Sequence, residues 1–414
     1  MIFMDKKNIL FLTILSFLFV QISFSKDNIT NPNNNDLNNN GLRVVSAGCL
    51  PATSSTELNI NNVRTLILGG GDMWWDLNNA VYEIPQGSNK HSMFAGALWI
   101  GGLDDQDNLK VAAMTYRQDG NDFWPGPLNG DPMSTEYGSV SASTCAEFDK
   151  HYKITRQEVE DYVAYTNCLS DPECDMSTYS EYVQPSIISD WPASRIDVDG
   201  TYDYLAPFVD VNGDGDYTVG LDYPGYDLEG VADCKTDDVL FGDQTLWWVF
   251  NDNGNIHTES GSESAIGLEI QAQAFGFATN DEINNMTFYS YKIINRSTES
   301  LNETYFGQWV DPDLGNYQDD YVGCDVELGL GYCYNGDADD DGAYGYNNDS
   351  DDPPPAIGVD FFRGPLADTG DFLDNDMDGI NSLVKFPITY ITDRESKSLD
   401  AFPVTPKEMM ENKL

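Results

Sequence analysis

Residues 308–365 read QWVDPDLGNYQDDYVGCDVELGLGYCYNGDADDDGAYGYNNDSDDPPPAIGVDFFRGP, and this acidic segment continues from a predicted strand at residues 303–311. Its carboxylates are too dense to share a folded loop unaided, because two unit charges about 4 Å apart repel by roughly 4 kcal/mol at an effective dielectric constant of about 20. A hard cation would remove the repulsion, and a set of oxygen ligands is typical of calcium sites. We therefore expect the segment to fold around calcium.

Short apolar segments separated by Gly- and Asp-rich turns occur throughout the chain and are typical of antiparallel strands. The longest, residues 266–279, presents two faces with the period of two that a strand requires. The sequence therefore predicts a mainly β fold of one or more antiparallel β-sandwiches, with long calcium-binding loops and a small helical insertion. The other predicted strands are residues 63–68, 80–84, 92–100, 109–117, 245–251, 286–296, 359–362 and 384–391.

The helical insertion is indicated by two capping-box spacings. Thr144 with Glu147, and Thr155 with Glu158, each place a hydroxyl and a carboxylate where they can cap a helix start reciprocally. Apolar side chains then recur on one helical face. This pattern predicts two short helices, or one interrupted helix.

The N-terminus has the pattern of a signal peptide. Lys6 and Lys7 precede an apolar run at residues 9–20, and small residues follow where a signal peptidase cleaves. An Asn-rich stretch comes next and contains almost nothing to bury. The expected organisation is a signal peptide at 1–25, a disordered leader at 26–58, an N-terminal β-rich region at 59–235 with the helical insertion at about 144–167, a β-sandwich at 236–392 with an acidic loop at 311–356, and a tail at 393–414.

The 414 residues include 69 acidic side chains against 21 Lys and Arg, which gives a formal net charge of −48. This charge argues against nucleic acid and anionic membrane surfaces as partners, because both attract basic patches. It is compatible with solubility outside the cell and with several bound divalent cations. After the signal peptide no apolar run approaches the roughly 20 residues of a membrane span, so we expect a secreted or cell-surface protein.

Seven cysteines in an exported chain predict disulfide bonds. Cys168 with Cys174, and Cys324 with Cys333, would each close a short loop and are the expected pairs. Zinc is not indicated, because no CxxC occurs and the three histidines are far apart. The cysteines whose pairing stays open, with one left over, are Cys49, Cys145 and Cys234.

Three runs share the spacing D-x-[DN]-x-D-G, in which alternate oxygens can converge on one ion while glycine permits a sharp turn. They resemble calcium turns of extracellular β proteins and not EF-hands, because the twelfth position is Leu221, Asn348 or Lys385 and not Glu. Solvated turns without metal are the alternative, since Asp and Gly both favour turns. The candidate ligands are Asp210, Asn212, Asp214 and Asp216, then Asp337, Asp339 and Asp341, then Asp374, Asp376 and Asp378.

A further candidate calcium site lies just after the predicted strand at residues 303–311 and consists of Asp311, Asp313, Asp319, Asp320 and Asp325. The first four also contain carboxylate pairs that could serve as acid and base in a glycosidase. We favour calcium, because chance alone supplies many Asp pairs in so acidic a chain. The signatures GxSxG, HExxH and GxxxxGK[ST] are absent, so no catalytic or organic-cofactor residue is predicted.

Adjacent aromatic residues occur at Trp74-Trp75, at residues 123–124 and at Trp247-Trp248. They could form stacking platforms for sugars. Core packing is the favoured interpretation, because adjacent residues of a strand point to opposite faces and at least one ring must point inward.

Four stretches resemble a family of large secreted or cell-surface proteins of Bacteroidota that are exported by the type IX secretion system. These are residues 62–83 (NVRTLILGGGDMWWDLNNAVYE), 90–102 (KHSMFAGALWIGG), 120–128 (GNDFWPGPL) and 308–365. The resemblance implies location more than activity. Members of this kind end in a β-sandwich sorting domain, which this chain is expected to lack.

We therefore expect a secreted or cell-surface structural and binding protein of the adhesion type that is stabilised by calcium. Its expected ligand is a surface polysaccharide or a protein. The alternative is a secreted hydrolase that acts on polysaccharide through a carboxylate pair.

Overall fold

The computed structural model describes residues 47–361 except 197–201, 233–237, 263, 326–327, 341, 343–344 and 347–353. The described part is mainly β, with several antiparallel sheets and few helices, as the strand pattern predicts. The predictions that lie outside the described residues are the signal peptide, most of the leader, the strand at 384–391, the tail, Cys234, Asp341 and the run Asp374, Asp376 and Asp378.

The larger sheet has seven strands in the order β1-β2-β3-β5-β16, with β4 paired to β2 and β5, and β6 paired to β5. β5 is buried over most of its 13 residues. Its partner β16 comes from far along the chain, since Leu103 pairs with Asn302 and Met93 with Pro312. The strands are β1 (Ser55–Leu58), β2 (Arg64–Leu68), β3 (Asp72–Met73), β4 (Tyr82–Glu83), β5 (His91–Leu103), β6 (Leu109–Ala112) and β16 (Asn302–Pro312).

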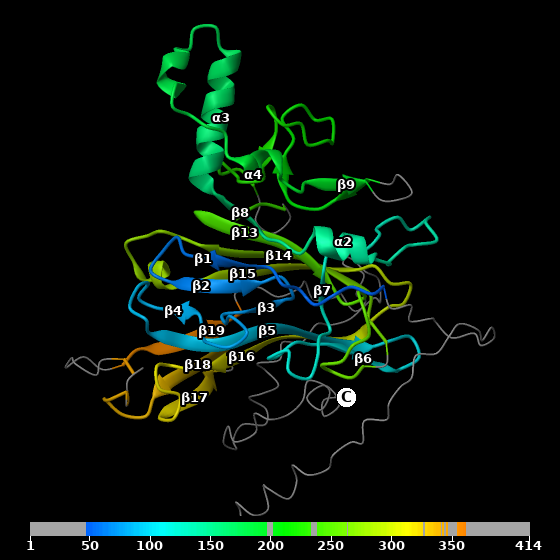
Figure 1. The fold of residues 1–414 in the computed structure, drawn as a ribbon, viewed down its shortest axis with the longest axis vertical. Coiled ribbons are helices and arrows are strands. Elements are labelled where there is room, and N and C mark those ends of the chain that lie inside the picture. The colour runs from blue at the N-terminus through cyan, green and yellow to red at the C-terminus, as the bar shows by residue number, and fades with distance from the viewer. Residues whose placement is uncertain are drawn as a thin grey trace, which may run out of the picture. The chain divides into compact units, whose positions relative to one another are not determined.

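The second sheet has five strands in the order β15-β14-β13-β7, with β8 also paired to β13. The two sheets pack together through the main core, to which one contributes Ile67, Ile100 and Phe306 and the other Trp248 and Ile270. Figure 1 shows β13 and β14 in one layer and β5 and β16 in another. The strands are β7 (Trp124–Pro125), β8 (Tyr152–Thr155), β13 (Gln244–Asn251), β14 (Leu268–Gly276) and β15 (Phe288–Asn295), with a short helix η2 (Glu282–Asn285) before β15.

Strand β13 is buried along its whole length because it lies between two cores. Leu246, Trp248 and Phe250 belong to the main core. Trp247 and Val249 belong to a second core formed with the helical insertion. The adjacent tryptophans are thus both core residues, each 1% exposed, as the sequence predicts.

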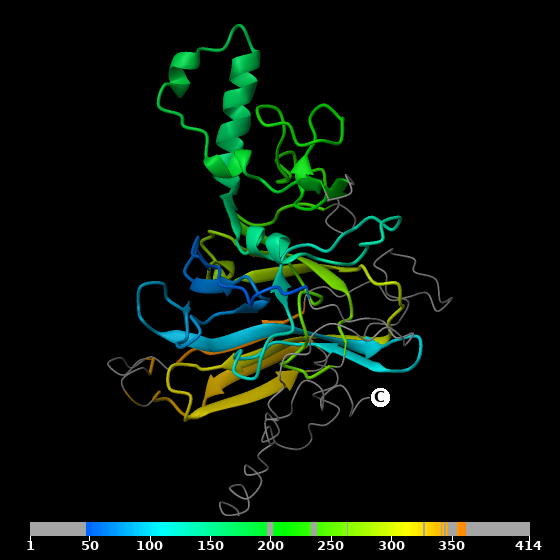
Figure 2. The ribbon, with the colours of Figure 1, turned by 45° about the vertical axis from the view of Figure 1, so that its right-hand side comes forward.

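The helical insertion covers the face of β13 that is remote from β5 (Figures 1 and 2). The capping box of α3 is confirmed, since Thr155 and Glu158 each accept from the other's backbone N–H. The start predicted at Thr144 is wrong, because Ser141 caps α2 and its hydroxyl accepts from the Thr144 amide. The elements are α2 (Ala142–Glu147), α3 (Arg156–Ser170), η1 (Met176–Tyr179), α4 (Ser186–Ser189), β9 (Ser194–Ile196), β10 (Tyr202–Tyr204), β11 (Phe208–Val209) and β12 (Tyr223–Pro224).

The acidic segment contains a three-stranded antiparallel sheet in the order β17-β18-β19, which its charge pattern does not predict. One face of this sheet carries Val322, Cys333 and Ile357, which pack with Leu314 and Tyr346. This small core explains why strands form in so acidic a stretch, since alternate residues still bury apolar surface. The strands are β17 (Asp320–Asp325), β18 (Leu330–Asn335) and β19 (Ala356–Asp360).

Two disulfides are present among the described residues. Cys168–Cys174 confirms the predicted short loop, and Cys49–Cys145 joins cysteines 96 positions apart. The predicted bond between Cys324 and Cys333 is wrong. In the register of β17 and β18, Cys324 lies opposite Gly331, two positions from Cys333. Such diagonal neighbours are about 7–8 Å apart, whereas the Cβ atoms of a disulfide are about 4 Å apart.

The packing of β13 predicts a large loss of stability for Trp248→Ala. Removal of a fully buried aromatic ring from a core lowers the free energy of unfolding by about 3–5 kcal/mol. Denaturant unfolding of the full chain measures this loss, with Val183→Ala, at a position that is 82% exposed, as the control. Equal stability of the two variants would contradict the burial of Trp248 in the main core.

Candidate functional site

The end of β16 positions the first two carboxylates of the candidate site. β16 pairs with β5 up to Pro312, with a register shift at this residue. Asp311 Oδ2 accepts a hydrogen bond from the Tyr116 hydroxyl at 2.6 Å. The backbone N–H of Asp313 donates to the Ser92 carbonyl at 3.3 Å. Asp311 and Asp313 are therefore held at the edge of the larger sheet.

Two more carboxylates reach the same region from β17 and from the turn after β18. Asp320 Oδ2 accepts from the Leu314 amide at 2.9 Å. Asp340 is only 1% exposed, and its carboxylate accepts from the amides of Asn316 (3.0 Å) and Tyr346. The Tyr346 hydroxyl donates in turn to the Ile84 carbonyl at 2.9 Å. Asp340 thus joins two parts of the acidic segment through the Asn316 and Tyr346 amides. The Tyr346 hydroxyl attaches the segment to Ile84, next to β4 of the larger sheet.

The carboxylates Asp311, Asp313, Asp320 and Asp340 are here named the carboxylate cluster, and burial together with neighbouring charges raises the pKa of Asp313 and of Asp320. The pKa of Asp313 is raised to about 7 by burial and by the charges of Asp311 and Asp320. The pKa of Asp320 is raised to about 6 by burial and by Asp340 and Asp319, against the Leu314 amide. Burial also raises the pKa of Asp311, and the Tyr116 hydroxyl opposes this.

Two oxygens of the carboxylate cluster are buried without a hydrogen-bond partner, Asp313 Oδ1 and Asp320 Oδ1. Burying such an atom is unfavourable unless a donor or a cation compensates it. The donor set is hard oxygen, which suits calcium. No group of three or more His, Cys, Asp or Glu in the described ranges is arranged to hold a metal ion, so these carboxylates gather without converging on one point.

The remaining predicted ligands of this region are placed differently. Asp325 lies at the opposite end of β17 from Asp320 and accepts from the Leu328 amide at 3.1 Å. Asp337 and Asp339 are exposed and form a local turn, in which Asp337 accepts from the Asp339 amide at 2.9 Å. The alternating pattern of the second run therefore missed Asp340, which lies out of step with it and is the residue that turns inward.

The first predicted run forms a tight loop. Asp210 accepts from the amides of Gly213 at 2.6 Å and Gly215 at 2.7 Å, and these contacts lower its pKa. Asn212 donates to Asp214 at 2.7 Å, and Asp214 accepts from the Asp216 amide at 2.9 Å. Asn212, Asp214 and Asp216 are exposed, and Asn212 Oδ1 accepts from the Asp214 amide at 3.1 Å within the loop.

Asp222 closes this loop and was missed by the sequence motif. It is fully buried and accepts from the amides of Val211 at 2.8 Å and Thr218 at 2.7 Å. It occupies the thirteenth position counted from Asp210, one beyond the position at which an EF-hand carries its last ligand. The signal in the sequence that could have identified Asp222 is a carboxylate one residue after the last ligand position of an EF-hand.

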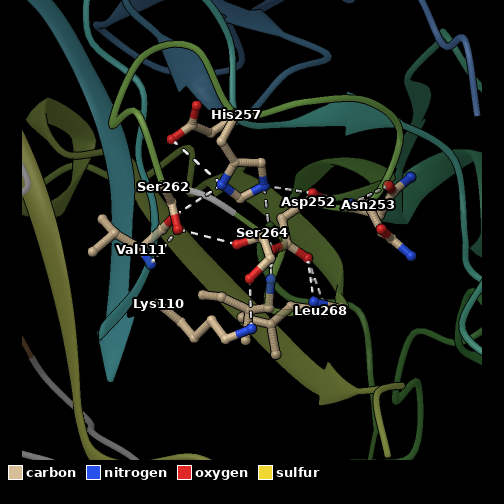
Figure 3. Close-up of polar contacts among 12 residues, drawn as sticks. Lys110, Val111, Asp252, Asn253, His257, Ser262, Ser264 and Leu268 are labelled. Carbon is tan, nitrogen blue, oxygen red and sulfur yellow. Dashed lines mark hydrogen bonds and ion pairs between the residues drawn. The ribbon is translucent and has the colours of Figure 1, made fainter. Parts of the chain in front are cut away.

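A separate polar cluster surrounds His257 (Figure 3). The ring nitrogens lie 2.8 Å from the Val111 carbonyl and 2.6 Å from the Asp252 carbonyl. Carbonyl oxygens only accept, so a ring nitrogen that is hydrogen-bonded to either carbonyl acts as the donor. Carboxylate oxygens of Asp122 and Asp252 lie 3.8 Å from Nδ1 and 3.5 Å from Nε2 of the ring.

This cluster contains Ser, His and Asp but lacks the geometry of a catalytic triad. Ser262 donates to the Ser264 carbonyl at 3.0 Å, and the Ser264 hydroxyl accepts from Lys110 at 2.6 Å (Figure 3). Within the part of the chain that the structure describes, no serine hydroxyl is bonded to His257. The second carboxylate, Asp252, accepts from the amides of Ile266, Gly267 and Leu268, so the cluster joins loops to β14.

Comparison of the chain with known protein families, curated proteins and solved structures finds no match. The candidate site is therefore interpreted from its own geometry and charge.

The carboxylate cluster predicts a pH dependence of stability in the presence of a chelator. A carboxyl group with a raised pKa in the folded chain favours folding at low pH and loses this contribution as the pH rises through the folded pKa. For Asp313 the loss extends from its ordinary pKa of 3.8 to about 7. The melting temperature should therefore fall over this range, and Asp313→Asn should reduce the fall.

The control is Asp105→Asn, which removes the same charge from an exposed turn. Because the lowered pKa of Asp210 acts in the opposite direction, the comparison of variants tests the prediction, not the wild-type profile alone. If both variants follow the same pH profile, Asp313 has no raised pKa in the folded chain.

Proposed function

We propose that the protein is a secreted or cell-surface structural and binding module of the adhesion type whose acidic loops are stabilised by calcium. The carboxylate cluster carries this proposal. Two of its oxygens are buried without a partner, and the pKa of Asp313 is raised to about 7. Calcium would coordinate the unpartnered oxygens, and its charge would offset the repulsion between the carboxylates that helps to raise the pKa of Asp313.

The location is supported by three observations. Two disulfides favour an oxidising compartment, outside the cytoplasm. Among the described residues no helix has the length and apolar character to cross a membrane. The resemblance of residues 62–83, 90–102, 120–128 and 308–365 to exported Bacteroidota proteins supports export by the type IX secretion system.

The loop at residues 210–222 is the second candidate calcium site of this proposal. Asp210 and Asp222 already fix its backbone through five amide contacts, so the chain itself holds the loop in shape. A preformed loop loses little conformational entropy when an ion binds. Asn212, Asp214 and Asp216 would supply the additional oxygens.

A secreted hydrolase acting on polysaccharide is the second candidate function. The observation in its favour is the pKa of Asp313, because a general acid must hold its proton near neutral pH. Calcium has more support, since four carboxylates gather where an acid and a base require only two. Hydrolysis of polysaccharide that is abolished by Asp313→Asn in the presence of calcium would favour the enzyme.

Calcium titration tests the main proposal. We expect calorimetry to detect binding to the full chain, and saturating calcium to raise its stability by about 2.7 kcal/mol at 100 times the Kd. The double variant Asp313→Asn/Asp320→Asn should lose the tightest binding event. No heat and no rise in melting temperature for the wild type would refute the proposal.

The matched control is Asp105→Asn/Asp107→Asn, which removes the same charge from the exposed turn between β5 and β6. It should bind calcium as the wild type does. Asp210→Asn, tested separately, assigns any remaining binding event to the loop at residues 210–222.

A further inference from the structure

The outer face of the β17-β18-β19 sheet presents three exposed tyrosines, here named the tyrosine face. Tyr321, Tyr332 and Tyr334 are 59%, 38% and 44% exposed. Tyr321 and Tyr334 lie directly opposite each other on β17 and β18. Ring centroids are 6.0 Å apart for this pair and 6.1 Å apart for Tyr332 and Tyr334, with interplanar angles of 28° and 36°. The rings therefore form a continuous aromatic surface.

Glycines leave room for these rings to lie close to the backbone. A Cβ at Gly323 would lie 2.6 Å from the Tyr332 ring, and one at Gly336 would lie 2.5 Å from the Tyr321 ring. On the other side of Tyr332 and Tyr334, β19 presents only Gly358 and Ala356. Small neighbours let the rings lie across the strands while their outer faces remain open to solvent.

The small sheet lies beside β5 and β16, on the side away from β13 (Figures 1 and 2). Its inner face is occupied, because Ile357 and Val359 pack against the main core. The tyrosine face is therefore the side that remains available to a partner. Exposed tyrosines of this density are typical of binding surfaces, since a ring offers contact area at low conformational entropy.

Charge decides which partner suits the tyrosine face. Asp325 and Asp360 stand at one end of it, each opposite Leu330. The sequence has no Lys, Arg or His between Arg296 and Arg363, so this segment contributes no positive charge of its own. Aromatic faces attract cations, and guanidinium groups both stack on tyrosine and pair with carboxylates.

We propose that the tyrosine face binds a basic, Arg-rich polypeptide segment of a partner protein, with guanidinium groups stacked on the tyrosines and paired with Asp325 and Asp360. This inference rests on the proposed function as a binding module, to which it adds the surface and the partner's chemistry. A neutral polysaccharide would use the rings but gain nothing from the charge.

The test measures binding of a labelled nine-residue arginine peptide to the full chain by fluorescence anisotropy, with calcium present and salt near physiological strength. These conditions screen the general attraction to a chain of net charge −48. The triple variant Tyr321→Ser/Tyr332→Ser/Tyr334→Ser, which keeps every charge, should bind at least about tenfold more weakly, as three exposed cation–π contacts predict. Tyr204→Ser, at a position that is 59% exposed elsewhere, should bind as the wild type does.

Two further variants distinguish lost contacts from a folding defect. Tyr334→Phe keeps the ring and should retain binding, whereas Asp325→Asn/Asp360→Asn should weaken it. Unchanged peptide affinity in a folded triple variant overturns the inference. The inference also fails if the wild type binds a neutral oligosaccharide and the triple variant loses that binding while it still binds the peptide. Calcium titration of the same variant separates the two proposals, since retained calcium binding leaves the carboxylate cluster intact whatever the peptide result.

Discussion

Strand β13 is the element on which the rest of the described structure depends, because it has no solvent-facing side. Trp248 fills the core between the two large sheets, and Trp247 fills the core beneath the helical insertion. A strand buried on both faces cannot shift its register by one residue without exchanging the contents of the two cores. The insertion is therefore fixed to the sheets by the same strand that joins the sheets to each other, through the side chains of its opposite face.

The acidic segment combines two surfaces of opposite character on one small sheet. Its inner face packs Val322, Cys333 and Ile357 next to the carboxylate cluster, and burial together with the Asp320 charge raises the pKa of the Cys333 thiol to about 12. A thiol held in its neutral form is a poor nucleophile and a poor metal ligand. The inner side of this region therefore offers carboxylate oxygens, whereas the outer face offers aromatic rings.

Most signals that act over a few residues could be predicted from the sequence, although the helix start predicted at Thr144 was wrong, and those set by distant pairing could not be predicted. The capping box of Thr155 and Glu158 and the Cys168–Cys174 loop are local, and both are present. The Cys324–Cys333 pair failed because the strand register, which the sequence does not display, separates the two residues. Asp340 and Asp222 were missed for a related reason. The alternating motif identifies residues by their spacing in the sequence, whereas the burial of a carboxylate depends on the segments that pack against it in the fold. The calcium ions themselves remain a prediction.

The pairing of β5 with β16 has a consequence for how the chain reaches its folded state. β16 supplies the partner of almost the whole of β5, yet it is made long after β5, once the helical insertion and β13–β15 have been synthesised. Until then β5 presents an open edge with buried-type side chains, which is the form most prone to pair with another chain. High contact order of this kind slows folding. A chain built in this way cannot complete its larger sheet until β16 has been synthesised, so the order of synthesis sets the earliest point at which the fold can close.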